Sequence, residues 1–486
     1  MDDIETVIEG RMLVDGELGY AQVGISEDGR IVAVGRYVSG GERRVELGTS
    51  EMLLPGFIDP HVHLRDPGMT WKEDFGTGTL AAIHAGVTCV YDMPNTAPPV
   101  VDPDTLLSKS RAVHGRAFTD YGLFAAVTSG INARMLAPYV VGFKLFMGST
   151  TGNILLDDDE ELVLISKDEE RCCRDHMRNR PPEAEWNAIS RLAAHFKGKA
   201  INICHVTTEE GLDLAKAAGF TTEITMHHMT FDADGHPGAE YKVNPPIRTS
   251  AVRDALRRRF LSGGFDMIGT DHAPHTVEEK SRPFQEAPSG IPGVETTMPI
   301  VMESVRRGDL PISEAVRMGA SEPGSLFQVG KGRIAPGYDA DFAVFDMRRS
   351  VAIDAGRLHS RCGHSPYGGF DAVFPKTVVV RGSIQVEDWE FCGEPIGRNV
   401  RGLRGRLFRD RRKACGMPAA VRDVLPLSAG GPSERKAVLQ EEPSEMPRHV
   451  SRSGAVHGSG SEEGQRVLRI PRESQMHDLR PSHDLL

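Results

Sequence analysis

The sequence predicts an α/β protein with a (β/α)8 TIM-like barrel and a small β-sandwich that is built from both chain ends. Three observations support this fold class. Strand-like and helix-like stretches alternate eight times between about residues 53 and 328, which favours a parallel barrel over an open sheet. Short strand-like runs precede this region, and similar runs return after it.

The predicted domains follow these changes along the chain. Residues 1–54 form the first part of the sandwich and include the strand "IVAVGRYV". Residues 55–330 form the barrel, and residues 331–400 complete the sandwich with "GRIAPGYDADFAVFD" and "TVVVRGSIQV". Residues 405–486 are rich in Ser, Gly, Glu, Pro and Arg and have no sustained apolar period, so we predict a disordered tail there.

The elements of the barrel can be taken in chain order. The eight predicted strands are "LLPGFIDPHVH", "GVTCVYDMPN", "AFTDYGLFAAV", "VVGFKLFM", "ELVLIS", "KAINICHV", "FTTEITMHH" and "FDMIGTDH". Between them lie stretches with helical character, of which the clearest are residues 181–198, 208–219 and 251–263. This alternation is the pattern of repeated βα units.

Composition excludes several classes of function. The net charge of −11 argues against nucleic acid as the main partner, because nucleic-acid binding usually needs a basic face. Hydrophobic residues make up 39% of the chain, but no apolar run is long enough to span a membrane. The seven cysteines include no C-x-x-C pair, and the N-terminus has no signal-peptide pattern, so we expect a cytoplasmic protein without disulfides.

Polar side chains stand where four of the predicted strands end. His61 and His63 are two apart, so on a strand they point to the same side. Lys144, His205 and Asp271 follow apolar runs in strands four, six and eight. Singly, each has a simpler reading: a packed histidine pair, a salt-bridged lysine or a hydrogen-bonded histidine. Together, at one mouth of a barrel, imidazoles and carboxylate suit Zn²⁺.

Lys144 adds a second kind of chemistry. A lysine amine that is buried beside cations should become neutral. A neutral amine can add CO2 and become an anionic carbamate, which would turn Lys144 into a bridging carboxylate.

Seven motifs in order give the chain a family resemblance between about residues 50 and 345. They are "DPHVHLRDPG", "DMPNTAPP", "GFKLFM", "ICHVTT", "VNPPIR", "TDHAPH" and "SGIPGVET". With them the chain resembles the cyclic amidohydrolases, most closely the dihydroorotases of archaeal, single-function type. The resemblance implies an enzyme that reversibly cyclises N-carbamoyl-L-aspartate to (S)-dihydroorotate with loss of water, in pyrimidine (UMP) biosynthesis.

The resemblance also implies a metal centre with two Zn²⁺ per subunit. His61, His63 and Asp271 would hold one zinc ion. Lys144, carrying a CO2-derived carbamate, would bridge to the second ion, which His205 helps to bind. Asp271 would also be the catalytic residue, because it would take a proton from the attacking hydroxide and deliver it to the leaving nitrogen.

Substrate contacts are implied at six further positions. Arg65 emerges beside His63 and would bind the substrate carboxylate as a bidentate pair, although a surface salt bridge is its simpler reading. The other implied contacts are Asn95 and His275 to the same carboxylate, and Asn244, Ser289 and Gly290 to the pyrimidine ring.

One departure from the family pattern concerns the second zinc ion. The fifth strand normally ends in a His-Ala-Glu-Asp stretch whose histidine binds this ion, but here Ile165 stands in that place. His176 and Asp168 are the nearest stand-ins, and neither sits at the matching position. We therefore expect a weakly occupied second site, with zinc per chain nearer one than two.

Two other functions stay open at this point. The chain could be another cyclic amidohydrolase (a dihydropyrimidinase, hydantoinase or allantoinase), although these substrates lack the ring carboxylate that Arg65, Asn95 and His275 would bind. It could also be a weak or inactive homologue that serves as a scaffold, for example by docking onto aspartate transcarbamoylase. The expected partners are a small-molecule substrate and, in a homo-oligomer, further copies of the chain.

Overall fold

The computed structural model describes residues 3–129, 131, 133–147 and 169–402. The predicted fifth barrel strand, "ELVLIS", and the predicted disordered tail, 405–486, lie outside the described residues. No helix in the described ranges has the length and hydropathy that a bilayer-spanning segment needs.

The first half of the predicted barrel contains a four-stranded parallel sheet. Its strands, in spatial order, are β6 (Phe57–Val62), β7 (Val87–Asp92), β8 (Asp120–Ala126) and β9 (Gly142–Lys144). The first three are buried along their whole length, as their near-continuous apolar sequences require of a parallel sheet that is covered on both faces. The helices of this half are α1 (Phe75–His84), α2 (Pro103–Val113) and α3 (Ala133–Leu136).

The second half contains a three-stranded parallel sheet. Its strands, in spatial order, are β10 (Asn202–Ile203), β11 (Thr221–Ile224) and β12 (Met267–Ile268). Its helices are α4 (Cys173–Asn179), α5 (Pro182–His195), α6 (Glu209–Ala217), α7 (Met226–Thr230) and α8 (Ser250–Leu261). Helices α5, α6 and α8 confirm the three helical stretches that the sequence predicted.

The two parallel sheets meet where β6 and β12 end. Val62 and His272 form a parallel bridge, and the His63 N–H donates to the His272 carbonyl at 2.8 Å. Asp59 strengthens this junction, because its Oδ1 accepts the backbone N–H of Thr270 at 3.1 Å and its Oδ2 accepts the Thr270 hydroxyl at 2.5 Å. The first and last strands are thereby side by side.

Strands from both ends of the chain pair in one nine-stranded sheet. Strand β5 (Glu51–Pro55) pairs antiparallel with β13 (Phe342–Asp346) in the register Leu54–Ala343, and this pair joins the early strands to the late ones. The remaining members are β1 (Ile4–Val14), β2 (Glu17–Ser26), β3 (Ile31–Gly35), β4 (Arg43–Glu46), β16 (Thr377–Val380), β17 (Ser383–Glu387) and β18 (Glu390–Phe391). Whether this sheet folds into the predicted β-sandwich stays a prediction.

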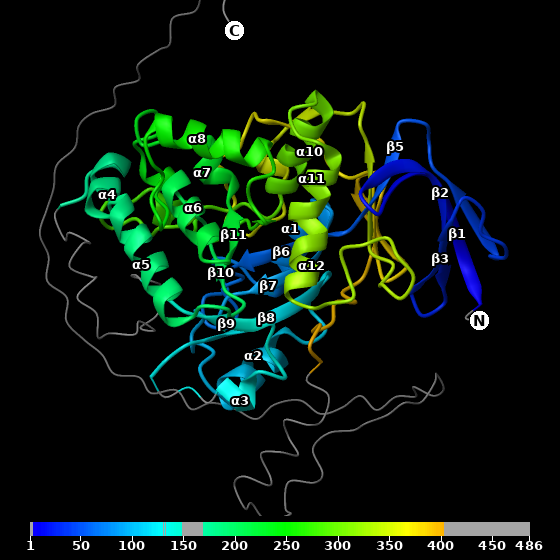
Figure 1. Cartoon of the computed structure of the whole chain (residues 1–486), viewed down its shortest axis with the longest axis horizontal. Helices are drawn as coiled ribbons and strands as arrows, with labels where there is room; N and C mark the ends of the chain where they lie inside the picture. The colour runs from blue at the N-terminus through cyan, green and yellow to red at the C-terminus, as the bar shows by residue number, and fades with distance from the viewer. Residues whose placement is uncertain (1–2, 130, 132, 148–168, 403–486) are drawn as a thin grey trace, which may run out of the picture. The chain divides into compact units, whose positions relative to one another are not determined.

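Figure 1 shows this sheet beside the helical part of the molecule. The blue strands β1, β2 and β3 and the yellow-to-orange later strands lie together on the right of the view, and α4 to α8 lie on the opposite side. Between them run α10 (Thr297–Arg307), α11 (Ile312–Val316) and α12 (Glu322–Leu326). The remaining short elements are α9 (Val277–Lys280), β14 (Val351–Ala352), β15 (Asp371–Ala372), the 3-10 turns η2 (Ala239–Tyr241) and η4 (Ala355–Arg357), and the π-helical turn η3 (Arg317–Ser321).

Helix α1 begins directly after the predicted site loop and is fixed by its cap. The Asp74 side chain accepts the Thr77 backbone N–H at 2.9 Å, and the Thr77 hydroxyl reaches back to the Asp74 N–H, which forms a capping box. Asp102 and Thr105 repeat this arrangement at the start of α2. These caps satisfy amide donors that the first turn of a helix otherwise leaves open.

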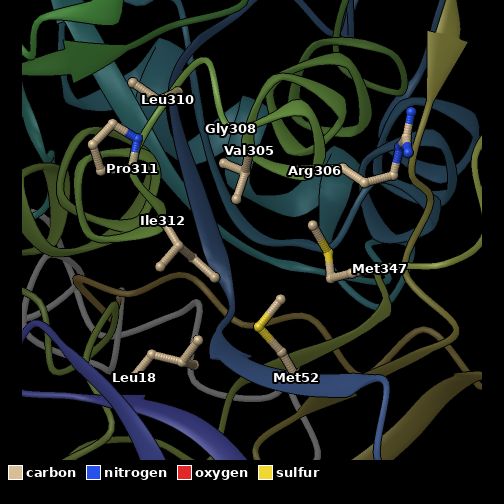
Figure 2. A pocket seen from close by; sticks show the side chains of 9 residues that line it. All are labelled: Leu18, Met52, Val305, Arg306, Gly308, Leu310, Pro311, Ile312 and Met347. Carbon is tan, nitrogen blue, oxygen red and sulfur yellow. The ribbon is translucent and has the colours of Figure 1, made fainter.

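An apolar pocket opens where the terminal sheet meets α10 and α11. Its volume is about 420 Å³, and it is lined by Leu18, Met52, Val305, Arg306, Gly308, Leu310, Pro311, Ile312 and Met347. Figure 2 shows the side chains of Leu18 and Met52 facing those of Ile312 and Met347, with Arg306 at one side. None of these residues is a predicted site residue, so the pocket is separate from the candidate chemistry.

A buried lysine ties the terminal sheet to the barrel strands. Lys331 Nζ lies 2.7 Å from Asp120 on β8, 2.7 Å from Asp341 next to β13 and 2.9 Å from Asp339. Lys331 is only 2% exposed, and the three carboxylates raise the pKa of its amine despite the opposing effect of burial. The lysine therefore remains charged and compensates a cluster of buried anions.

Lys331→Met should lower the free energy of unfolding by about 3–5 kcal/mol, because it removes the cation of the buried Asp341 carboxylate, whereas Asp120 and Asp339 keep their ion pairs with Arg381 and Arg30. Lys376→Met is the matched control, since Lys376 makes a partly exposed pair with Glu51 at 2.7 Å and should cost at most about 1 kcal/mol. Chemical denaturation of both variants measures the difference. Equal losses in the two variants would contradict the role given to Lys331.

Candidate active site

The two histidines of the His-x-His motif converge on Asp271. His61 lies on β6 and His63 directly follows that strand, and their ring centroids are 5.3 Å apart. His63 Nε2 lies 3.0 Å and His61 Nε2 lies 3.4 Å from the same Asp271 oxygen, Oδ1. The three side chains are buried, and their ligand atoms lie within 4.8 Å of one another. The structure thus brings together three of the predicted metal ligands.

The charges of this group suit a cation. Burial, the nearby Lys144 and His63 lower the pKa of His61 well below its ordinary value, so its imidazole is neutral. Burial alone would raise the pKa of Asp271, but His61, His63 and His205 outweigh this effect and hold that pKa well below its ordinary value. A neutral imidazole and an ionised carboxylate are the protonation states that metal binding requires.

The other edge of the His61 ring faces a second group of donors. His61 Nδ1 lies 2.8 Å from Glu223 Oε1, and Cys204 belongs to the same group within 4.8 Å. Glu223 is on β11 and also accepts the backbone N–H of His205 at 3.3 Å. Glu223 therefore fixes the orientation of His61 from behind, as carboxylates commonly do for metal-binding histidines.

His205 approaches the same group from the end of β10. Its ring centroid lies 5.2 Å from that of His61, and its backbone φ is 41°, a left-handed conformation uncommon for residues other than glycine. Burial and the Lys144 charge lower the pKa of His205 to about 3. Its buried Nδ1 has no hydrogen-bond partner among the described residues.

Lys144 ends β9 and interacts electrostatically with the same cluster. Burial would lower the pKa of Lys144, whereas Cys204, Glu223 and Asp271 raise it, and the balance lies above the ordinary value. The side chains alone therefore favour an ammonium. The neutral amine that the sequence predicts beside cations stays a prediction.

The residues fit a divalent metal ion. Buried imidazoles and a carboxylate on separate strands are the donors that catalytic zinc sites use. The unpartnered Nδ1 of His205 fits the same interpretation, since buried ring nitrogens normally have a hydrogen-bond partner unless they bind something else.

Predicted substrate residues form a second group next to this cluster. Arg65 follows His63, is 3% exposed and has a left-handed φ of 60°. Its Nη2 lies 3.2 Å from His275 Nε2, and its Nε donates to the Pro274 carbonyl at 3.3 Å. Burial lowers the pKa of Arg65 to about 10, which leaves it cationic at neutral pH. Arg65 makes no ion pair with a described carboxylate, although four more distant carboxylates act on it, so its guanidinium can still pair with an anionic ligand.

His275 connects Arg65 to the loop that contains Ser289. Burial and the neighbouring Arg65 and Lys72 lower the pKa of His275, so its ring is neutral. Lys72 Nζ lies 3.1 Å from His275 Nδ1, and the Ser289 carbonyl lies 3.0 Å from Nε2. Nδ1 accepts from the Lys72 ammonium and Nε2 donates to the Ser289 carbonyl, so the Arg65 guanidinium contacts Nε2 without donating a hydrogen bond to it.

Lys280 anchors the loop at Ser289 and Gly290. Its buried amine donates to the carbonyls of Lys242, Pro288 and Gly290 at 3.0 to 3.2 Å. Gly290 has φ 146°, and a Cβ there would lie 2.3 Å from the Ala273 carbonyl oxygen. Only glycine fits this position, so the loop follows one path past His275.

Asn95 and Asn244 lie in different surroundings. Asn95 Oδ1 accepts from His63 Nδ1 at 2.7 Å, so this residue orients a predicted metal ligand. Asn244 Oδ1 accepts from His176 Nε2 at 2.8 Å, and among the described residues no hydrogen bond connects Asn244 to the Asp271 cluster. The predicted contacts of Asn244 with a ring remain a proposal.

His176 is not a stand-in for the missing ligand of the second ion. Its Nδ1 lies 2.6 Å from Glu170 Oε2, and its Nε2 is taken by the Val243 carbonyl and Asn244. Both ring nitrogens are therefore engaged in holding the Asn244 segment. Ile165 and Asp168 lie outside the described residues.

Sequence reasoning missed four residues that build the site. Glu223 could have been found as an acidic residue inside the apolar strand "TTEIT", and Cys204 directly precedes His205. Lys72 and Lys280 carried no signal, because nothing in the sequence shows that they converge on His275 and its loop. The histidines His227 and His228 were expected to close a strand, but they lie in helix α7, which begins two residues after β11 ends.

Comparisons with known proteins agree with this geometry. The sequence profile of the amidohydrolase family matches residues 52–384. The chain is 33% identical to a dihydroorotase of Thermoplasma volcanium over 413 residues, which cover 80% of this chain and 96% of that protein. It is 34% identical to a dihydroorotase of Halobacterium salinarum over 426 residues, which cover 81% of this chain and 99% of that protein. The chain therefore belongs to the amidohydrolase family, in its dihydroorotase group.

Solved structures support the fold. An L-hydantoinase (dihydropyrimidinase) from Arthrobacter aurescens superposes with a TM-score of 0.75 at 24% identity, covering 82% of this chain and 99% of that one. A dihydropyrimidinase from Brevibacillus agri gives a TM-score of 0.72 at 24% identity over 82% of this chain and 98% of that one. At this identity the likeness concerns the fold alone.

The stability of the protein should rise with pH through the buried Lys280. Burial lowers the pKa of Lys280 to about 7 from an ordinary value of 10.5, so between these values the unfolded chain binds more protons than the folded one. Between pH 7 and 9 the free energy of unfolding should increase by about 2 kcal/mol more in the parent than in Lys280→Met. Urea denaturation at both pH values measures this difference.

Lys216→Met is the control for this prediction, because Lys216 makes an exposed ion pair with Asp266 at 2.7 Å and should show no such difference from the parent. A parent and a Lys280→Met variant with the same pH dependence would show that the buried amine does not titrate in this range.

Proposed function

We propose that the site catalyses the dihydroorotase reaction, the reversible conversion of (S)-dihydroorotate and water to N-carbamoyl-L-aspartate. Hydrolysis breaks the bond between a ring carbonyl carbon and the ring nitrogen, and water supplies OH to the carbon and H to the nitrogen. The observation that carries the proposal is the position of the buried Arg65–His275 pair beside the His61–His63–Asp271 cluster. The dihydroorotase relatives support it independently.

The substrate carboxylate separates this function from that of the structural neighbours. Dihydroorotate carries a carboxylate on its ring, whereas hydantoins and unsubstituted dihydropyrimidines do not. Arg65 offers a charged, planar donor pair for that group, and the neutral His275 adds no charge of its own. A buried guanidinium would be left without an anion by a substrate that lacks the carboxylate, which disfavours those substrates.

The metal centre of this proposal contains zinc. His61, His63 and Asp271 would hold one ion, and Lys144 and His205 would contribute to a second. Zinc, when bound, lowers the pKa of water and polarises an amide carbonyl. Glu223 and Asn95 hold the Nδ1 atoms of His61 and His63, so each ring presents Nε2 to the ion.

Lys144 takes part in this centre as a carbamate. The Lys144 ammonium first loses a proton. The resulting neutral amine then reacts with CO2, which forms an N–C bond and releases a second proton, so that a cation is replaced by an anion. An anionic oxygen donor next to His205 and Asp271 would balance the charge of two zinc ions, which an ammonium at this position would oppose.

Asp271 serves as the proton carrier. Its carboxylate is held in the charged form and lies against His61 and His63, so it can accept a proton when water attacks. The same oxygen can then deliver this proton to the leaving ring nitrogen. In the reverse direction the two transfers occur in the opposite order.

The fold in which this chemistry takes place is proposed to be a closed (β/α)8 barrel. The two parallel sheets would be its two arcs, since they already meet at the Val62–His272 bridge. Both parts of the nine-stranded sheet would form the predicted sandwich, with the domain limits 1–54, 55–330 and 331–400. All site residues would then lie at the carboxyl end of the barrel, where barrel enzymes place their chemistry.

Arg65→Ala should raise KM for dihydroorotate by roughly thirtyfold to several hundredfold, because a charge-assisted bidentate pair contributes about 2–4 kcal/mol. The KM of Arg65→Lys should lie between those of Arg65→Ala and the parent, because lysine keeps the charge but lacks the planar donor pair. Arg116→Ala is the control: Arg116 is partly exposed and binds Asp66 at the foot of the same loop. Steady-state kinetics of the three variants test the assignment, and an unchanged KM in Arg65→Ala would refute it.

Asp271→Asn should lower kcat for dihydroorotate by at least about 10²–10⁴, the range typical of a lost general acid–base. Zinc content is measured in parallel, so that loss of metal is distinguished from loss of proton transfer. The exposed Asp213, which pairs with Arg259 at 2.7 Å, gives the control variant Asp213→Asn. Turnover close to that of the parent in Asp271→Asn would place the proton carrier elsewhere.

A further inference from the structure

The second zinc position is short of one imidazole. Lys144 and His205 are the only family ligands for it that the described residues retain at matching positions, since Ile165 stands where a histidine is expected. His176, the described stand-in, has both ring nitrogens engaged elsewhere. Another donor on a neighbouring strand would remove this shortage.

His227 lies just beyond the end of the middle strand of the three-stranded parallel sheet. In the order β10–β11–β12, β11 is the middle strand. His205 follows the end of β10 by two residues, and Asp271 follows the end of β12 by three. His227 follows the end of β11 by three residues as well, so parallel strands bring it to the same edge between His205 and Asp271.

The His227 ring is buried and one of its nitrogens has no partner. Its exposed fraction is 1%, and its Nε2 makes no hydrogen bond with any described residue. A buried polar atom without a partner is rare and calls for an explanation such as a bound ion. The neighbouring strand end carries the second such atom, His205 Nδ1.

The adjacent His228 shows what a structural histidine does in this helix. Its Nδ1 lies 2.6 Å from the Thr225 hydroxyl, and its Nε2 lies 3.0 Å from the Pro245 carbonyl. His228 thus fixes α7 to the Asn244–Pro245 segment through contacts at both of its ring nitrogens. The His228 ring centroid lies 4.4 Å from that of His227, whereas Nε2 of His227 has no hydrogen-bond partner among the described residues.

We propose that His227 supplies the imidazole that Ile165 cannot, as a protein ligand of the second zinc ion together with His205 and Lys144. This inference rests on the proposed function for the identity of the centre. It replaces the expectation of a weak second site: the parent protein should bind close to two zinc ions per chain at limiting metal.

His227→Asn tests the proposal by metal counting on the full-length protein. Zinc per chain, measured after equilibration with limiting zinc, should fall from near two to near one. Competition with a chelator should show second-site affinity weakened at least about 10–100-fold, the loss found even for residues that only orient a ligand. The first ion should remain, because His61, His63 and Asp271 are unchanged.

His84→Asn is the matched control. The Nε2 of His84 is also buried and unpartnered among the described residues, but this histidine ends α1 and stacks on His359 with a centroid distance of 3.8 Å. A helix that connects β6 to β7 ends at the amino side of the sheet, away from the metal cluster. His84→Asn should therefore bind the same amount of zinc as the parent.

His227→Cys provides a readout that a merely structural role would not give. A thiolate at this position should keep the second ion, and X-ray absorption at the zinc edge should then show one additional sulfur neighbour per two zinc ions compared with the parent. Circular dichroism and the unfolding midpoint report whether each variant is folded, and the sulfur signal decides the question even if His227→Asn folds poorly.

Three results would overturn the proposal: one zinc ion in the parent, two zinc ions in a folded His227→Asn, or no new zinc–sulfur contact in His227→Cys. Turnover of dihydroorotate by the parent is measured separately. If the metal results hold but the parent does not turn over dihydroorotate, the proposed function fails while the ligand assignment stands. If turnover is normal and the metal results fail, only the ligand assignment is lost.

Discussion

The contact between Asp59 and Thr270 is the constraint on which the geometry of the site depends. Asp59 accepts N–H groups from both His61 and Thr270 at 3.1 Å, so a single carboxylate sets the spacing of the first and last strands. Burial raises the pKa of Asp59 to about 7, and the hydrogen bonds from Thr270 and His61 offset this increase only in part. A buried carboxylate is unfavourable unless it is satisfied, and here that satisfaction requires β6 and β12 to be in register. Asp271 meets His61 because of that register.

Burial also determines the charges of the cluster. It keeps the imidazoles of His61 and His205 neutral, whereas Asp271 remains an anion because histidines surround its oxygen. Glu223 and Asn95 orient the two rings, because they hydrogen-bond Nδ1 of His61 and Nδ1 of His63. Ligands that are already deprotonated and already oriented need little rearrangement when a cation binds.

The sequence predicted the parts of the site that depend on strand periodicity. His61, His63, His205 and Asp271 stand where apolar runs stop, and the carboxyl ends of parallel strands lie at one edge, so their convergence followed from local pattern alone. Properties that depend on distant neighbours could not be predicted in this way. The protonation of Lys144 depends on Cys204 and Glu223, two residues whose proximity no local pattern reveals.

The two halves of the site are held by different means, and this difference explains how one fold serves several substrates. The metal side is held by strand ends, whereas the Arg65 side is held by loops that Lys72 and Lys280 secure through His275 and the Ser289–Gly290 carbonyls. The hydantoinase neighbours share the fold at 24% identity. Loops tolerate sequence change better than buried strands do, so the Arg65 side is the part of the site that can change while the strands stay intact.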